Sequence, residues 1–183
     1  MIEDVGSLSA ATCHEAGHAI AAVLRGLPLI QVSIRSDGRN GCCLTEEPSD
    51  VYLRLQDNDE EAIRWAEDKM VMLAAGVEAE RALRGSASAI GDGDDRTAIG
   101  NLIAALIPPL SATAPLPEQD EHDRVVEERR SSVYSRATAL LTPPAVQKAL
   151  VEVASLLSQK GTASGAEVEA IVRKHVPFAK KVG

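Results

Sequence analysis

The segment His14-Glu15-Ala16-Gly17-His18 fits the pattern His-Glu-x-x-His (HEXXH). Residues four apart lie on one face of an α-helix, about 6 Å apart along its axis. Two imidazoles placed in this way can bind one zinc ion, and the carboxylate next to the first of them can reach a water molecule at the metal. The pattern therefore predicts His14 and His18 as zinc ligands and Glu15 as the general base of a hydrolase.

The residues around this motif are almost all apolar, which predicts a buried helix. Two histidines and a glutamate buried without partners would cost several kcal/mol, and a bound metal removes this conflict. Gly17 lies inside the same helix, where glycine costs about 1 kcal/mol relative to alanine. We expect Gly17 to allow either close helix packing or the approach of another segment to the metal.

A catalytic zinc site needs a third protein ligand. His122 and His175 lie in strongly charged segments, and we expect them to be solvated. The aspartates of the segment 91–95, Gly-Asp-Gly-Asp-Asp, precede a predicted helix, where acidic residues are also expected as caps. Asp95 falls on the apolar face of that helix, whereas Asp94 is rotated off it. We therefore predict Asp95 as the third ligand and keep Asp94 as the second candidate.

Glu80 is the other carboxylate that must be weighed as a ligand. It falls at the edge of the apolar face of a predicted helix over 61–85, within about 50° of the centre of that face. A glutamate in this position can orient a ligand histidine, bind the metal itself or be an ordinary boundary charge. We favour the first and the last of these roles over direct binding.

The predicted elements that position these residues are mostly helices. The first helix is expected over 10–24, with Ser7 or Ser9 as its N-terminal cap and an end near Gly26. A long helix is expected over 61–85. The remaining predicted helices are one that follows the polar loop 91–95, and three more over 118–141, 144–159 and 165–174, with a proline-rich loop over 108–117.

One short hairpin interrupts the helical pattern. Alternating apolar residues over 29–35 predict a strand whose Ile30, Val32 and Ile34 face the same way. Turn residues follow, and 42–45 can return as the partner strand. Residues 1–183 are therefore predicted to form a single, mainly α domain with a small β-hairpin.

Composition limits the classes of partner. The 183 residues include 19 basic and 27 acidic side chains, which gives a net charge of −8. This balance argues against nucleic acid and against an anionic membrane as partners. The three cysteines include an adjacent pair, and we expect reduced thiols rather than a disulfide framework. Without a recognisable signal peptide or membrane span, we expect a cytoplasmic location.

Taken together, these motifs resemble the peptidase domain of the FtsH family of ATP-dependent zinc metalloproteases. The likeness is greatest in the HEXXH motif, and Ala75-Gly76 stands where the family has paired glycines. The other segments that carry it are Val32-Ser33-Ile34, Gly41-Cys42-Cys43-Leu44-Thr45, the glycine-containing helix over 73–80, the aspartate loop 91–95 and the segment 164–168.

The resemblance implies an FtsH-peptidase-like fold and a zinc-dependent endopeptidase. The phosphate-loop pattern Gly-x-x-x-x-Gly-Lys-[Ser/Thr] does not occur, so we expect a stand-alone peptidase that acts on loose peptides or unfolded proteins. The protein partners implied are further copies of this chain or an ATPase supplied in trans. The main alternative is a non-catalytic zinc-containing domain that binds a partner or regulates such an ATPase. An HEXXH hydrolase with a non-peptide substrate is a third hypothesis.

Overall fold

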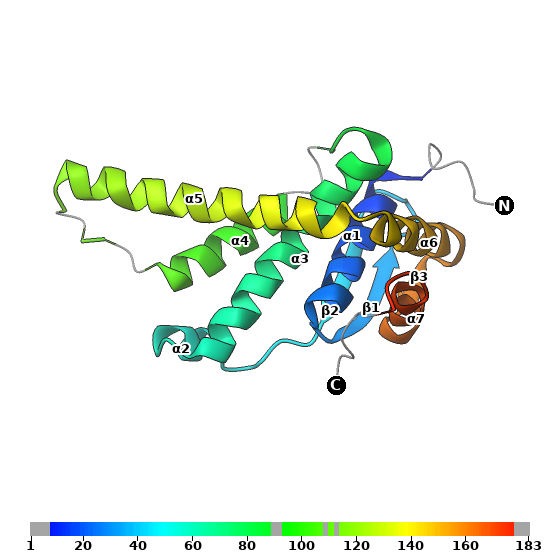
Figure 1. Ribbon diagram of the computed structural model, residues 1–183, viewed down its shortest axis with the longest axis horizontal. Helices are drawn as coiled ribbons and strands as arrows, with labels where there is room; N and C mark the ends of the chain where they lie inside the picture. Colours follow the sequence, from blue (N-terminus) through cyan, green and yellow to red (C-terminus); the bar gives the residue numbers. More distant parts are fainter. Residues whose placement is uncertain (1–7, 89–92, 108–109, 112–113, 178–183) are drawn as a thin grey trace.

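The computed structural model describes residues 8–88, 93–107, 110–111 and 114–177. The described part is mainly helical with one small sheet (Figure 1), so the predicted fold class is confirmed at that level. The helices are α1 (Ala10–Arg25), α2 (Val51–Gln56), α3 (Glu60–Arg84), α4 (Gly93–Leu106), α5 (Leu116–Leu141), α6 (Pro144–Lys160) and α7 (Gly165–His175). The strands are β1 (Leu29–Ile34), β2 (Gly41–Thr45) and β3 (Thr162–Ser164). None of the described helices has both the length and the apolar composition that crossing a membrane requires.

Helix α1 is the central element, as its apolar sequence predicts. Its N-terminus is capped by Ser9, whose hydroxyl oxygen accepts a hydrogen bond from the Thr12 N–H group at 3.1 Å. Its C-terminus ends at Gly26, which has the left-handed φ of 75° that glycine adopts without strain. All residues from Thr12 to Val23 are buried, because α3, α6 and the sheet surround the helix.

Helix α3 is the second core element. Asp59 caps its N-terminus by accepting hydrogen bonds from two backbone N–H groups, and Gly85 ends it in the left-handed conformation. Every residue from Met70 to Glu80 is buried. This central part of α3 packs against α1 on one side and against α5 on another.

The backbones of α1 and α3 touch where they cross. A Cβ atom at Gly17 would overlap the carbonyl oxygen of Ala75 and the Cβ atom of Ala79. A Cβ atom at Gly76 would lie 2.6 Å from both the Nε2 atom of His14 and the Cε1 atom of His18. Gly17 therefore serves the close helix packing that was one of its two predicted roles.

The sheet has the strand order β2-β1-β3, and both pairings are antiparallel. The predicted hairpin of β1 and β2 is confirmed, whereas β3 was not predicted. The prediction that Ile30 shares a face with Val32 and Ile34 is wrong. A register shift between Leu29 and Gln31 rotates Ile30 outward, so Ile30 is 46% exposed while Val32 is fully buried.

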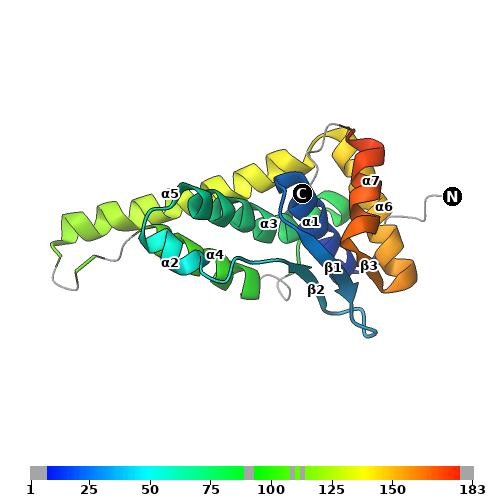
Figure 2. The same cartoon turned by 90° about the horizontal axis from the view of Figure 1, so that it is seen from below.

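Helix α4 begins earlier than predicted. It starts at Gly93, so Asp94 and Asp95 lie in its first turn rather than in a loop, and residues 91–92 lie outside the described residues. The short helix α2 was not predicted, and residues 108–109 and 112–113 of the predicted proline-rich loop are also outside the described part. In Figures 1 and 2, α4 and α5 extend away from the three strands, which lie beside α1 and α7.

The contact at Gly17 gives a test of the helix crossing. Replacing Gly17 by alanine should lower the free energy of unfolding by about 1–3 kcal/mol, because the added methyl group overlaps α3. Gly100→Ala is the matched control, since nothing lies within 4 Å of a Cβ atom there and alanine favours a helix interior. Urea denaturation should show this control to be neutral or stabilising. Equal effects of the two substitutions would contradict the crossing.

Candidate metal centre

Three predicted ligand residues meet at one point beside the helix crossing. Helix α1 presents His14 and His18 on one face, and the first turn of α4 presents Asp95. The Oδ2 atom of Asp95 lies 2.8 Å from Nε2 of His14 and 3.1 Å from Nε2 of His18. One ligand atom from each of the three residues lies within 4.8 Å of the others. The geometry therefore brings together the residues that the sequence singled out.

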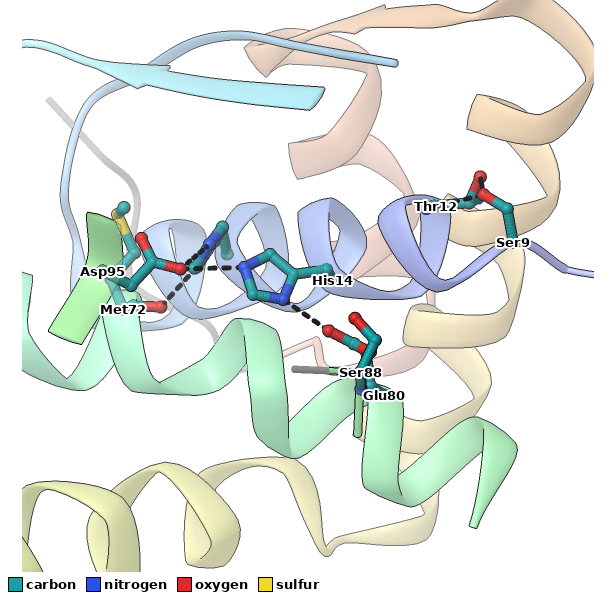
Figure 3. A network of polar contacts seen from close by, with 8 residues as sticks. Ser9, Thr12, His14, Met72, Glu80, Ser88 and Asp95 are labelled. Atoms are coloured by element: carbon teal, nitrogen blue, oxygen red, sulfur yellow. Dashed lines mark hydrogen bonds and ion pairs between the residues drawn. The ribbon is translucent and has the colours of Figure 1, made fainter. Parts of the chain in front are cut away.

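The second nitrogen of each imidazole is held by α3. Nδ1 of His14 lies 2.7 Å from Oε1 of Glu80, as Figure 3 shows, and Nδ1 of His18 lies 2.8 Å from the carbonyl oxygen of Met72. The other oxygen of Glu80 accepts a hydrogen bond from the Ser88 N–H group at 2.7 Å. Glu80 is thus placed to orient His14, which is one of the roles predicted for it. It is not part of the three-residue cluster.

These outer contacts decide where the imidazole protons lie. A carbonyl oxygen can only accept a hydrogen bond, so His18 must donate its Nδ1–H to Met72. His14 donates in the same way to the carboxylate of Glu80. In their neutral forms, both histidines therefore direct an Nε2 lone pair at the carboxylate oxygen of Asp95. Three electron-rich atoms converge, and a proton or a metal ion between them would remove their mutual repulsion.

A proton on His14 supplies positive charge to the cluster. Burial lowers the pKa of His14, but its hydrogen bonds to Asp95 and Glu80 outweigh burial and raise this pKa to about 10. Burial raises the pKa of Asp95, yet the hydrogen bonds from both histidines hold it well below its usual range. The pKa of Glu80 is lowered too, because the contact with His14 and the Ser88 N–H group outweigh burial.

The residues present fit a zinc ion. Two imidazoles and one carboxylate are a ligand set of catalytic zinc sites, which leave a fourth position open. Gly76 provides the space for the two imidazole rings, because any larger residue would press a Cβ atom against both of them. Zinc can replace the proton at Nε2 of His14 without any change in the hydrogen bonds of the two Nδ1 atoms.

Glu15 lies beside the cluster but outside it. Its side chain is buried at 7% exposure, and its Oε2 atom has no hydrogen-bond partner among the described residues. Burial raises the pKa of the Glu15 carboxyl, against the lowering effect of charge on His18 and His14. Gly41 of β2 holds this side chain in place, since a Cβ atom at Gly41 would overlap the Cγ atom of Glu15. A buried carboxylate with a free oxygen and a raised pKa suits a general base.

A cleft of about 370 Å³ opens beside the three ligand residues and Glu15. Its walls come from α1, the turn before β2, β2 itself, α3 and the first turn of α4. The other residues that line it are Ala10, Ala11, Arg39, Asn40, Gly41, Cys42, Cys43, Lys69, Met72, Leu73, Glu80, Ser88, Gly93 and Asp94. Burial raises the pKa of the Cys43 thiol, so this cysteine stays protonated near neutral pH.

Strand β2 forms one wall of this cleft with a free edge. The Arg35 N–H group donates to the Asn40 carbonyl oxygen at 2.8 Å, so these residues form a hydrogen-bonded pair of the hairpin. Bonded and non-bonded pairs alternate along an antiparallel ladder, which places Gly41 and Cys43 in non-bonded pairs with β1. Their backbone N–H and C=O groups therefore point away from β1, toward the edge that no other described strand covers.

The other histidines lie far from this cluster but are not solvated as predicted. Nε2 of His175 lies 2.7 Å from Oε2 of Glu152, and the His175 side chain is 19% exposed. His122 is 24% exposed, and its Nε2 atom is buried between α5 and the segment after α4. His175 contacts Glu152 of α6, and His122 lies beside Ile107 and Leu110, and local charge patterns do not indicate either contact. The three cysteines are free, as expected.

Sequence reasoning missed several groups that complete the site. The Met72 carbonyl and the Ser88 N–H group belong to the backbone, so no residue type signals them. Gly41 was noted only as a turn residue and as part of a segment that carries the resemblance, and Lys69 was not noted at all. Lys69 could have been found, because it lies four residues before Leu73 and seven before Gly76 on the predicted helix.

No protein-family model matches this chain, and no curated protein matches it.

The two candidate aspartates can be separated by metal binding. Asp95→Asn should weaken zinc binding by more than about 100-fold, since a neutral amide replaces the carboxylate that faces both imidazoles. Asp94→Asn removes the same charge one residue away, where the side chain is exposed, and should leave the affinity nearly unchanged. Competition with a chromophoric chelator measures both affinities. Loss of zinc in the second variant alone would overturn the choice of Asp95.

Zinc binding should also release a proton. The pKa of His14 is raised to about 10, so its imidazole is protonated near pH 7.5 and must lose that proton to coordinate a metal. Asp95 has a lowered pKa and is already ionised, so it contributes no proton. Calorimetric titration at about pH 7.5 in buffers of different ionisation enthalpy should give about one proton released per zinc.

The variant Glu80→Gln tests whether the released proton comes from His14. It removes the carboxylate that helps to raise the pKa of His14, so fewer protons should be released and zinc should bind about 10- to 100-fold more weakly. A binding enthalpy that is the same in every buffer would contradict the assigned protonation of His14.

Proposed function

We propose that this chain is a zinc metalloendopeptidase in which His14, His18 and Asp95 hold the metal and Glu15 is the general base. One observation carries the proposal: three electron-rich atoms converge beside a cleft, next to a buried oxygen of Glu15 that has no hydrogen-bond partner among the described residues. A structural zinc site is closed by four protein ligands and needs no free base. The three-ligand cluster and the free oxygen of Glu15 both favour catalysis.

A zinc ion held there would polarise a substrate carbonyl and lower the pKa of a coordinated water molecule to about 7. The chain's own groups do the rest of the proposed work. The Oε2 atom of Glu15 accepts a proton from the attacking water and delivers it to the leaving amine. Glu80 and the Met72 carbonyl keep both imidazoles oriented, and the burial of Glu15 keeps competing water away from the base.

The free edge of β2 supports a peptide substrate over a small molecule. An extended peptide can add to this edge as a further strand, because the backbone groups of Gly41 and Cys43 are directed toward it. Gly41 packs directly on Glu15, so the added strand would pass over the general base. Such a binding mode requires a locally unfolded substrate, which fits loose peptides and unfolded proteins.

The FtsH-peptidase-like character of the fold belongs to the same proposal. It is supported by an HEXXH helix that crosses a glycine-containing helix, by an aspartate at the start of the next helix and by a hairpin at the cleft. Association with further copies of the chain, or with an ATPase in trans, remains a prediction from the resemblance. The cytoplasmic location remains a prediction as well.

The proposal is tested by replacing the base alone. Glu15→Gln should keep the zinc content of the wild type, because Glu15 lies outside the ligand cluster. It should lower the cleavage rate of unfolded casein by at least about 100-fold. Metal analysis and gel-based proteolysis of the same preparations measure both quantities.

Glu60→Gln is the matched control, since it removes a carboxylate from an exposed position at the start of α3. It should leave zinc content and cleavage unchanged. If the wild type binds zinc but cleaves no unfolded protein, the enzymatic proposal fails and the non-catalytic zinc domain takes its place.

A further inference from the structure

A single stripe along α3 connects the metal site to a lysine at the far end of the cleft. Trp65, Lys69, Met72, Gly76 and Glu80 are spaced by three or four residues, so they lie on one side of the helix. The last three of them contact or orient the two metal-binding histidines. Lys69 lines the same cleft. The stripe thus places an ammonium group and the metal ligands in one continuous groove.

The Lys69 side chain is held in a defined position. Its Nζ atom donates a hydrogen bond to Oγ1 of Thr45 at 2.8 Å and lies 2.6 Å from Oε1 of Glu47. It also lies 6.0 Å from the centre of the Trp65 ring, and the side chain is 12% exposed. A lysine on an open surface samples many rotamers. This ammonium group is instead fixed at the C-terminal end of β2.

Two independent paths give the distance from the catalytic centre to Lys69. Along α3, Lys69 lies seven residues before Gly76, which is about 10 Å at the rise of an α-helix. Along β2, Thr45 lies four residues after Gly41, which is about 13 Å at the rise of a strand. Gly76 touches both imidazoles and Gly41 touches Glu15, so both paths start at the centre. Their lengths correspond to three or four residues of an extended peptide.

The direction of the added strand decides which side of the substrate meets Lys69. The sheet is antiparallel throughout, and antiparallel pairing is slightly more stable than parallel pairing. A peptide antiparallel to β2 has its N-terminal part next to Thr45 and its C-terminal part next to the turn that carries Arg39. Lys69 therefore faces residues that precede the bond lying over Glu15.

We propose that Lys69 is a specificity-determining residue that selects substrates with an acidic side chain three or four residues before the cleaved bond. This inference rests on the peptidase function proposed above. A glutamate or aspartate of the substrate would take the place of Glu47, whose side chain is 54% exposed and can turn into solvent. The hydrogen bond from Lys69 to Thr45 keeps the ammonium group in the cleft during this exchange.

Glu47 would compete with the substrate carboxylate for Lys69. Substitutions of Lys69 and of Glu47 should therefore have opposite effects on the preference for acidic substrates. Removing the cation should abolish the acidic preference, whereas removing its competitor should increase it. Lys69→Met keeps an unbranched apolar side chain at this position, and Lys69→Arg keeps the charge. Arg64→Gln is the matched control, because it removes an exposed cation from the same helix outside the cleft.

The experiment uses unstructured peptides that differ by one glutamate-to-glutamine exchange at each position. Mass spectrometry locates the cleaved bonds, and kcat/KM is measured for each pair of peptides. For the wild type we expect the glutamate peptide to be preferred about fivefold when the exchange lies three or four residues before the cleaved bond. Lys69→Met should reduce the ratio to about one, Glu47→Gln should increase it about twofold or more, and Lys69→Arg and Arg64→Gln should retain it.

A second measurement separates recognition from catalysis. Zinc-loaded Glu15→Gln protein is titrated with the same peptides carrying a fluorophore, and the ratio of Kd values should follow the same order among the Lys69 and Glu47 variants. If this variant prefers acidic peptides but the wild type cleaves none, the peptidase proposal fails and recognition by Lys69 stands. Cleavage without an acidic preference, a preference retained in Lys69→Met, or a preference after the cleaved bond overturns the inference about Lys69.

Discussion

The contact between the backbones of α1 and α3 is the constraint on which the site depends. Gly17 and Gly76 leave no room for a Cβ atom at the crossing, so the two helices approach more closely than ordinary side chains permit. This approach brings the Met72 carbonyl and the Glu80 carboxylate within 2.8 Å of the imidazole Nδ1 atoms. A wider crossing would leave those nitrogens without partners and the two rings free to rotate.

The fixed orientation of the two imidazole rings also determines the electrostatic contact of α1 with α4. Because the Nδ1 atoms donate to α3, the Nε2 lone pairs face Asp95 on α4, and the cluster is stable only with positive charge between these atoms. A bound metal would therefore join α1 to α4, and α3 would take part through its hydrogen bonds to the two imidazoles. The free energy of metal binding would then add to the stability of the N-terminal turn of α4, which carries little apolar surface of its own.

Much of this arrangement could be predicted from local patterns. The HEXXH spacing, the cap at Ser9 and the glycine at position 26 define α1, and the helical period after Asp95 places that residue on the inner face. The register shift that exposes Ile30 could not be predicted, because it depends on how β1 pairs with β2 and not on the apolar pattern of β1 alone. The three-residue strand β3 could not be predicted either, because it pairs with β1 across more than a hundred residues of sequence. Glu80 was among the predicted residues, but the Met72 carbonyl group and the Ser88 N–H group were not, because backbone groups are not marked by any residue type.

The position of the hairpin is what the proposed action on a peptide chain depends on. The turn before β2 directs the strand across Glu15, where the absence of a side chain at Gly41 lets the backbone rest on the carboxylate stem. The non-bonded pairs of β1 and β2 leave Gly41 and Cys43 facing the free edge rather than the sheet. A chain that pairs with this edge must lie extended, with a carbonyl group close to both the base and the ligand cluster. In the proposed peptidase, the strand that binds the substrate would therefore also set which of its bonds meets Glu15.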